Sequence, residues 1–230
     1  MIPRGFVFDL DGTLVDNMAI HAAAFAEFVR RHGLPPLSDA DRGRFDGRRN
    51  RDIFPSLFGR DLAEDELQRF SGEKEALYRE LSRGRLRPLA GLLALLDRLD
   101  AALIPVAVAT SAPAENVEHT LRELRLQDRL GRVVRSDEVP RGKPHPDVFL
   151  AAARALGVPA DACVAFEDAP LGVRAARAAG MEVVAVTTTF PAEAFVAHGA
   201  TPDHAVGDFE EFVAGPGAWL PNPASGPSSR

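Results

Sequence analysis

The sequence has little of what marks several classes of protein. It contains one cysteine, Cys163, so a disulfide within the chain is impossible and a reducing, cytoplasmic location is expected. Lys and Arg number 27 against 33 Asp and Glu, a formal net charge of −6, so nucleic acid is not an expected partner. No apolar run is long enough to cross a membrane, and the N-terminal apolar stretch is too short for a signal peptide. The six histidines include no pair at metal-ligand spacing, which argues against a zinc site.

The most distinctive stretch is residues 6–16, FVFDLDGTLVD. An apolar run that favours a strand ends there at Asp9 and Asp11, followed by a glycine turn. Ligands bind at the carboxyl ends of strands in open α/β sheets, and carboxylates two residues apart leave an extended backbone on one side. They repel each other unless a cation lies between them or one stays protonated. The stretch therefore predicts a metal site, an acid/base role, or both. An EF-hand loop is excluded, because it requires a glycine at its sixth position and a glutamate at its twelfth. Counted from Asp9, Gly12 is fourth and Ile20 is twelfth.

The hydrophobic period divides the chain into two kinds of structure. From Asp16 to about Leu86 apolar residues recur at helical spacing, which predicts helices at 19–32, 49–58 and 65–83 without a strand. After residue 87, helices and strands alternate, which is typical of a parallel sheet covered on both faces. The expected strands are 106–109, 132–134, 163–166, 183–186 and one near His204, and the expected helices are 89–99, 114–124, 146–156, 171–179 and one near Phe209.

This pattern predicts a core that is interrupted in the sequence. Residues 1–15 and 87–213 are expected to form the α/β core, and residues 16–86 are expected to form an inserted helical cap above the carboxyl end of the sheet. Residues 214–230 are rich in Pro, Gly and Ser and are expected to form a tail.

Two further segments place anion-binding groups near the expected strand ends. Thr110 and Ser111 follow the strand at 106–109, where hydroxyls and the free amides of the next helix can hold an anion. Lys143 lies in a loop with two prolines ahead of a helix, and a point charge held there can neutralise phosphate and carboxylate together. Each segment alone has a plain structural explanation, as helix-capping residues or as a solvated loop lysine.

A second pair of acids, Glu167 and Asp168, ends the strand at 163–166. Acids at this strand end beside Asp9 would complete an oxygen-rich site for Mg²⁺, a cation that prefers carboxylates, waters and phosphate oxygens. A helix cap by Asp168 would explain this pair alone. It is a weak explanation for four strand-end motifs in one chain.

The ordered set DLDGTLVD, ATSA, GKPHPD and FEDAPLGV resembles the haloacid dehalogenase superfamily, specifically its phosphatase and β-phosphoglucomutase branch with a helical cap. The resemblance covers nearly the whole chain apart from the tail. It implies a Rossmann-like, doubly wound parallel sheet with an all-helical cap. It also implies a Mg²⁺-dependent phosphatase that hydrolyses a small phosphorylated metabolite, most readily a sugar phosphate, through an aspartyl-phosphate. A dehalogenase is disfavoured, because dehalogenases lack the second aspartate that Asp11 supplies here.

The resemblance assigns roles to residues of the core. It implies that Asp9 is the nucleophile and that Asp11 is the general acid/base. It implies that the transferring phosphoryl group is bound by Thr110 and Lys143. The implied metal ligands are Asp9, Asp11 through its backbone carbonyl, Glu167 and Asp168.

The cap is expected to select the substrate. Its arginines gather within ten positions, at Arg42, Arg44, Arg48, Arg49 and Arg51. One or two of them could recognise a hydroxyl or a distal anion by bidentate contacts. Ser111 is expected to contact the substrate from the core. His21 and Lys74 match cap residues of the branch, whereas Asn17 departs from its usual Ser or Thr.

Two alternatives stay open at this point. A β-phosphoglucomutase-type mutase shares the core motifs, but it also needs a cationic cap group that binds the phosphate distal to Asp9. The pattern that resembles this group in β-phosphoglucomutases is an arginine followed three residues later by a serine, shortly after a cap glycine. Ungapped alignment from Gly47 places Asn50 and Ile53 there, although Arg49 or Arg51 could stand in after a shift of one residue. A non-catalytic binding protein on the same fold is the second alternative. For any of these we expect a small phosphate ester as the partner, and a monomer or small homo-oligomer.

Overall fold

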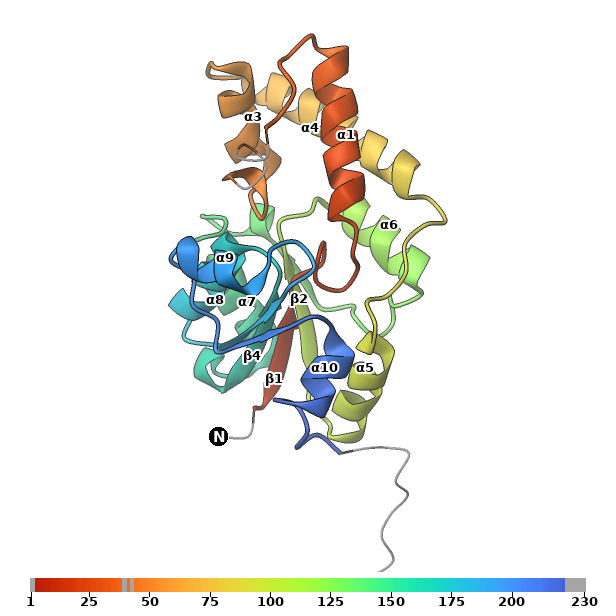
Figure 1. The fold of residues 1–230 in the computed structure, drawn as a ribbon, viewed down its shortest axis with the longest axis vertical. Coiled ribbons are helices and arrows are strands. Elements are labelled where there is room, and N and C mark those ends of the chain that lie inside the picture. The colour runs from red at the N-terminus through yellow and green to blue at the C-terminus, as the bar shows by residue number, and fades with distance from the viewer. Residues whose placement is uncertain (1–2, 39–40, 42–43, 222–230) are drawn as a thin grey trace, which may run out of the picture.

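The computed structural model describes residues 3–38, 41 and 44–221, and across them the chain forms a six-stranded parallel sheet (Figure 1). The strands lie in the order β3-β2-β1-β4-β5-β6, with β1 near the centre. Their bounds are β1 Gly5–Phe8, β2 Val106–Thr110, β3 Val133–Arg135, β4 Cys163–Glu167, β5 Glu182–Val186 and β6 His204–Val206. The predicted α/β fold class is confirmed. Since the chain first runs from β1 to β2 and β3 and then returns to β4 on the other side, the sheet has a switch point between β1 and β4.

Helices cover both faces of the sheet because successive side chains of each strand point to opposite sides. Phe6 and Phe8 of β1 pack on one face with α5 (Leu92–Ala101), α6 (Ala114–Leu124) and α10 (Phe209–Ala214). Val7, between them, packs on the other face with α7 (Asp147–Leu156), α8 (Pro170–Ala178) and α9 (Ala192–Ala197). All four residues of β1 are buried, as expected for a central strand of a parallel sheet.

Three helices stand above the carboxyl end of the sheet with a hydrophobic cluster of their own (Figure 1). They are α1 (Met18–Arg31), α3 (Asn50–Phe58) and α4 (Glu64–Ser82), and each end lies within one residue of its predicted position. Phe28, Phe54, Phe70 and Tyr78 are the large buried side chains among them. We call α1, α3 and α4 the cap helices, and we propose residues 16–86 as the cap.

The bounds of α5 and the presence of α9 differ from what the sequence predicts. The helix expected from residue 89 begins at Leu92, because Gly91 takes φ 75° and lies against α10, where a Cβ would be 2.3 Å from Glu210 N. The short helix α9 was not predicted, since Phe195 is its one buried side chain and a single buried position gives no period.

The chain after α10 packs back on the core. Leu220 is buried against the cluster that contains α5 and α10, and its carbonyl accepts a hydrogen bond from Arg98 Nη1 at 3.4 Å. Trp219 stays 42% exposed. The part of the expected tail at residues 222–230 lies outside the described residues. Within the described ranges, no helix has both the length and the apolar character that a membrane crossing requires.

Candidate active site

The carboxyl ends of three adjacent strands bring the predicted core residues together. Asp9 follows β1, and its backbone N–H donates to Phe166 O at 2.9 Å, so the ladder with β4 continues into the site. Thr110 ends β2 and is 1% exposed, and its hydroxyl accepts a hydrogen bond from Ala112 N at 3.0 Å. Glu167 ends β4. The close approach follows from the parallel pairing of β1 with both neighbours.

Lys143 reaches this floor from the loop ahead of α7. Its Nζ lies 2.5 Å from Asp9 Oδ1 and 2.5 Å from Glu167 Oε1, and all three side chains are buried. Burial by itself would lower the pKa of Lys143, but the negative charges of Asp9 and Glu167 outweigh it and raise that pKa above its ordinary value. The ammonium is therefore a fixed positive charge between two carboxylates.

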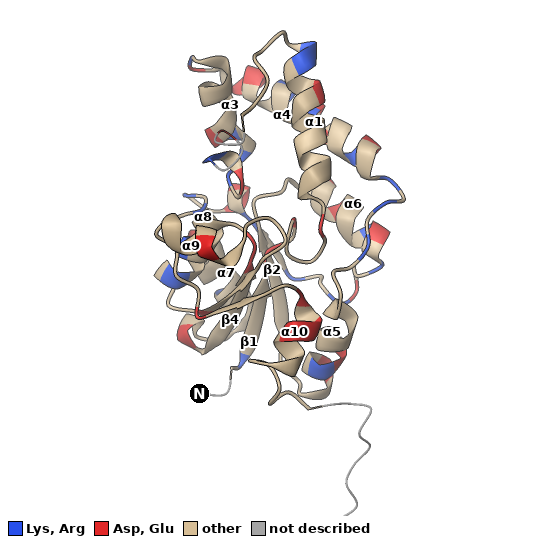
Figure 2. Cartoon of the chain, viewed as in Figure 1, with Lys and Arg blue, Asp and Glu red and all other residues tan. Residues whose placement is uncertain are grey.

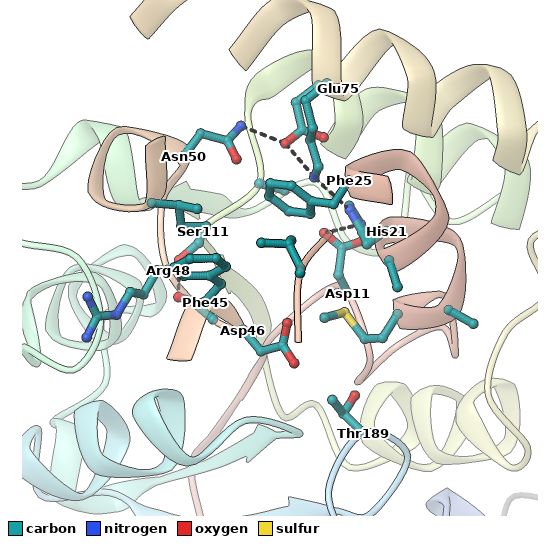
Figure 3. Close-up of a pocket in the computed structure, with 18 of the residues that line it drawn as sticks. Asp11, His21, Phe25, Phe45, Asp46, Arg48, Asn50, Glu75, Ser111 and Thr189 are labelled. Carbon is teal, nitrogen blue, oxygen red and sulfur yellow. Dashed lines mark hydrogen bonds and ion pairs between the residues drawn. The ribbon is translucent and has the colours of Figure 1, made fainter. Parts of the chain in front are cut away.

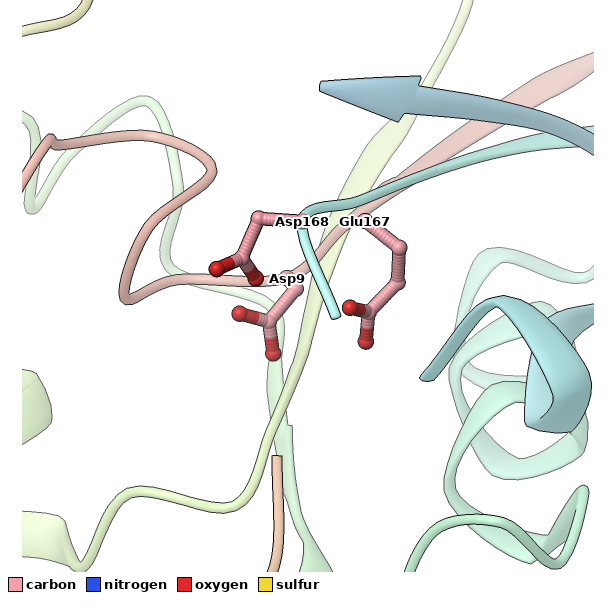
Figure 4. A group of neighbouring side chains, drawn as sticks. All are labelled: Asp9, Glu167 and Asp168. Atoms are coloured by element: carbon pink, nitrogen blue, oxygen red, sulfur yellow. The ribbon is translucent and has the colours of Figure 1, made fainter. Parts of the chain in front are cut away.

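A third carboxylate, that of Asp168, joins Asp9 and Glu167. One oxygen from each of the three lies within 4.8 Å of the others (Figure 4). Burial raises the pKa of Asp9 to about 8, with Lys143 opposing the shift and Glu167 adding to it. Burial and the charges of Glu167 and Asp9 also raise the pKa of Asp168 well above its usual value. Such crowded, desolvated oxygens fit a hard divalent cation, whose charge would offset their repulsion.

Asp11 is held apart from this cluster and faces the cap. Asn17 Nδ2 donates to Asp11 Oδ1 at 2.7 Å, while Asn17 Oδ1 accepts from Gly12 N at 2.9 Å and so fixes the orientation of the amide. His21 Nε2 lies 3.5 Å from Asp11 Oδ2 (Figure 3). Burial would raise the pKa of Asp11, but His21 and Asn17 outweigh it and hold that pKa below its usual value. The pKa values of Asp9 and Asp11 are therefore shifted in opposite directions although the two residues lie two positions apart.

A cavity of about 960 Å³ lies between the sheet and the cap helices. Asp9, Asp11, Thr110 and Asp168 contribute to its lining from the core. Side chains of α1, α3 and α4 contribute from the cap, among them Phe25, Ile53 and Glu75. The volume falls at the upper end of the roughly 300–1,000 Å³ that is usual for small-molecule sites.

Three of the five predicted substrate contacts line this cavity. His21 Nδ1 lies 3.0 Å from Lys74 Nζ, and the His21 ring stacks on Tyr78 with a centroid separation of 3.8 Å. Lys74 also lies 4.4 Å above the centre of the Phe25 ring. Ser111 Oγ donates to Gly47 O at 2.9 Å, so it joins the core to the cap side of the cavity.

The other two predicted contacts, Arg49 and Arg51, do not line the cavity. Arg49 is the N-cap residue of α3, and its guanidinium contacts Asp52 at 2.8 Å and Ser136 O at 3.3 Å. Arg51 pairs with Glu64 at 2.9 Å on the exposed side of the helix. Both guanidinium groups thus contact residues that do not line the cavity. Arg42, from the same run, lies outside the described residues.

Two threonines of the site were missed by the sequence analysis. Thr188 Oγ1 donates to Gly12 O, and Thr189 Oγ1 donates to Asp168 Oδ2, so the loop after β5 supports both acidic motifs. Gly12 is required there, since it has φ 80° and a Cβ would lie 2.0 Å from Asp168 Oδ2. The signal was present, because Thr188 and Thr189 follow closely on the expected strand at 183–186, as the other site residues follow theirs.

Known proteins resemble this chain in sequence and in fold. A family model described as haloacid dehalogenase-like hydrolase matches residues 6–186. Validoxylamine A 7'-phosphate phosphatase of Streptomyces hygroscopicus subsp. limoneus is 33% identical over 82% of this chain and 87% of that protein. Hexitol phosphatase A of Escherichia coli (strain K12) is 33% identical over 80% of this chain and 82% of that protein. The crystal structure of a hydrolase from Pseudomonas syringae superposes with a TM-score of 0.82 at 26% identity, covering 94% of this chain and 99% of the other.

Proposed function

The chain belongs to the haloacid dehalogenase-like hydrolases and is a phosphoric monoester hydrolase, and from that premise we propose that it dephosphorylates a small carbohydrate phosphate through an aspartyl-phosphate, with Mg²⁺. One observation carries the proposal: Asp9 is joined by Lys143 to Glu167 on the floor of a cavity that Asp11 also lines. The sugar phosphatases among the relatives support the substrate class. We further propose that the protein is a cytoplasmic monomer or small homo-oligomer.

In the proposed reaction Asp9 attacks phosphorus, and the bond from phosphorus to the alcohol oxygen breaks. Asp11 gives its proton to the leaving alkoxide, then takes a proton from the water that cleaves the aspartyl-phosphate and restores Asp9. Its lowered pKa suits the second step, and the charge of the incoming phosphate would raise that pKa for the first.

The groups around Asp9 handle the negative charge of the phosphoryl group. Lys143 offsets the repulsion between the carboxylate and the phosphate from its fixed place beside Asp9. The residues that would hold Mg²⁺ are Asp9, Glu167 and Asp168, with the backbone carbonyl of Asp11. A bound Mg²⁺ would supply electrostatic stabilisation of the charge on the phosphoryl oxygens.

Metal removal tests the proposed cofactor. The purified protein is expected to release p-nitrophenol from p-nitrophenyl phosphate with Mg²⁺, to fall to background after treatment with EDTA, and to recover when Mg²⁺ is added back. The reason is that three desolvated carboxylates repel the substrate dianion unless a cation offsets them. A full rate in the metal-free protein would contradict the metal assignment. Background rates on a panel of phosphate esters, with Mg²⁺ binding retained in calorimetry, would favour the non-catalytic binding protein instead.

The mutase alternative predicts a different product. Asn50 and Ile53 line the cavity at the two positions that align with the arginine and the serine of the mutase pattern. Arg49 and Arg51 do not line it, because their guanidinium groups contact Ser136 and Glu64. We therefore expect β-glucose 1-phosphate, given with a trace of the 1,6-bisphosphate, to yield free phosphate in excess over glucose 6-phosphate. The two products are separated by coupling glucose 6-phosphate to its dehydrogenase and measuring phosphate colorimetrically. Isomer formation far faster than phosphate release would establish the mutase.

A further inference from the structure

Asn17 is fully buried at the start of the first cap helix, and none of the proposed chemical steps uses it. It is the N-cap residue of α1, a position where asparagine ordinarily accepts a hydrogen bond from an amide of the first helical turn. Among the described residues of that turn, none donates to its side chain. The helix therefore lacks a contact that typically contributes about 1 kcal/mol, and capping does not explain the residue.

The oxygen and both N–H groups of the Asn17 amide are bonded outside the helix turn that it begins. Oδ1 accepts from Gly12 N at 2.9 Å, and Nδ2 donates to Asp11 Oδ1 at 2.7 Å and to the Tyr78 hydroxyl at 2.6 Å. An amide nitrogen has two hydrogens, so these bonds use both of them. The orientation of the amide is settled as well, since Gly12 N–H is a donor and therefore requires Oδ1.

A hydroxyl side chain at this position would not donate in the same way. Serine and threonine, the usual residues here in the branch that the chain resembles, have a single O–H hydrogen. Either could donate to Asp11 or to Tyr78, but not to both. The pair of bonds that runs from one nitrogen to Asp11 and Tyr78 is therefore particular to the asparagine of this chain.

These bonds fix one oxygen of the Asp11 carboxylate. Oδ1 accepts from Asn17, whereas Oδ2 faces His21 Nε2 at 3.5 Å (Figure 3), and Asp11 lines the cavity together with Asp9. An aspartate side chain without such a bond can change its rotamer. A general acid must lie within hydrogen-bond reach of the oxygen that it protonates, so the orientation of this carboxylate matters for the first chemical step.

Tyr78 connects this arrangement to the cap and to the core. It belongs to α4, is fully buried, and its hydroxyl lies 3.4 Å from Thr120 Oγ1 of α6. α4 lies above α6 (Figure 2), and Asn116 of α6 joins the two helices, since its amide donates to Glu75 at 2.6 Å and accepts from Arg79 at 2.8 Å. The hydroxyl that completes the hold on the acid/base residue is thus fixed by the docking of α4 on the core.

We propose that Asn17 is the positioning residue of Asp11: with its amide held by Gly12 and by Tyr78 of α4, it aligns the general acid with the oxygen of the leaving group. The inference rests on the proposed phosphatase function and adds to it the group that orients the proton donor. Asn17 acts through Asp11, because it is not among the described residues that line the cavity.

Two aryl esters that differ in the acidity of the leaving group test this. p-Nitrophenolate leaves without a proton at neutral pH, whereas phenolate, whose conjugate acid has a pKa of about 10 like that of tyrosine, gains more from a proton donor. In Asn17→Ala we expect kcat/KM for phenyl phosphate to fall by about 10²-fold, the lower end of what general acid catalysis contributes. For p-nitrophenyl phosphate it should fall by less than about tenfold, so the ratio of the two values should fall by at least about tenfold. kcat/KM includes only the steps through release of the phenol, so hydrolysis of the aspartyl-phosphate does not affect the ratio.

The ratio is measured within one preparation with Mg²⁺, so a loss of folded protein cancels. Ser82→Ala is the matched control, because it also removes a buried polar contact between α4 and α6, in which Ser82 Oγ lies 2.8 Å from His119 Nε2. That contact includes neither Asn17 nor Asp11, so the ratio should be unchanged. A general loosening of the cap would instead lower the ratio in both variants.

Two smaller changes keep the test valid if Asn17→Ala does not fold. Tyr78→Phe removes one oxygen and keeps the ring that stacks on His21, and the ratio should fall by about threefold, the effect of one neutral hydrogen bond. Asn17→Ser caps a helix as well as asparagine does but has one donor, so its ratio should lie between those of Asn17→Ala and the wild type.

Failure of the inference and failure of the proposed function give different results. An unchanged ratio in Asn17→Ala, or an equal fall in Ser82→Ala, would overturn the inference alone. So would a wild-type protein that cleaves p-nitrophenyl phosphate but not phenyl phosphate, because it would lack an aligned acid. An unchanged ratio in Tyr78→Phe would overturn the part assigned to Tyr78. No release of p-nitrophenol by the wild type would overturn the proposed function, and the inference with it.

Discussion

Asp9→Asn is expected to abolish phosphate release, with kcat on the order of 10⁶-fold lower, the scale seen when a catalytic nucleophile is removed. The amide keeps the shape of the carboxylate but cannot attack phosphorus. Lys143 keeps its contact with Glu167, so the packing of the site should be retained. The measurement is single-turnover and steady-state release of phosphate with Mg²⁺, together with circular dichroism to verify the fold.

A chemically identical change provides the control. Asp161, in the turn that precedes β4 at the opposite end of that strand from Glu167, is exposed, and Asp161→Asn should keep wild-type activity. The nucleophile assignment fails if Asp9→Asn turns over at more than a small percentage of the wild-type rate. A loss of activity in both variants would point to a general effect of the substitution rather than to the site.

Lys143→Met has the second large expected effect, on both stability and catalysis. It leaves the buried carboxylates of Asp9 and Glu167 without their shared cation, and removal of one partner from a buried ion pair costs about 3–5 kcal/mol. The free energy of unfolding, measured by urea denaturation in metal-free buffer, should fall by about that amount. Activity should fall by about 10²–10³-fold, the effect of losing one group that stabilises transition-state charge.

A second substitution separates the two effects. Glu167→Gln in the Lys143→Met background removes one of the two stranded charges, so it should restore part of the unfolding free energy without restoring activity. Arg141→Met, in the same loop, removes an exposed cation that pairs with Asp147, and it should change stability by less than about 1 kcal/mol. A Lys143→Met protein as stable as the wild type would show that the bridge does not hold the two strand ends together.

The core of the site could be predicted because it depends on local sequence and a simple rule of topology. An apolar run that stops at acidic residues predicts the end of a strand, as before Asp9 and before Glu167. Parallel strands bring such ends to one edge of the sheet. Thr188 and Thr189 obey the same rule, because they follow the end of β5 and contact Gly12 and Asp168.

The cap residues could not be predicted in the same way. Helical periodicity located α3 and α4 to within a residue, but it does not say which helix of the core each will face. Arg49 and Arg51 were expected in the site from their charge, yet α3 directs them to Ser136 and Glu64. Glu75 stands in a run of charged residues that gives no sign of its burial, although its side chain is buried in the cavity lining.

The sequence by itself determined the motifs of the core: the strand-end acids, the lysine and the threonine are local patterns, and their ordered set resembles a family of phosphoryl-transfer enzymes. Only the tertiary structure decided which side chains line the cavity. The Glu75 carboxylate owes its place to Asn50 and Asn116, which lie 25 and 41 positions away in the sequence. Contacts of that kind depend on how α4 docks against α3 and α6, and this docking is set by the packing of whole helices rather than by any residue pattern within one of them.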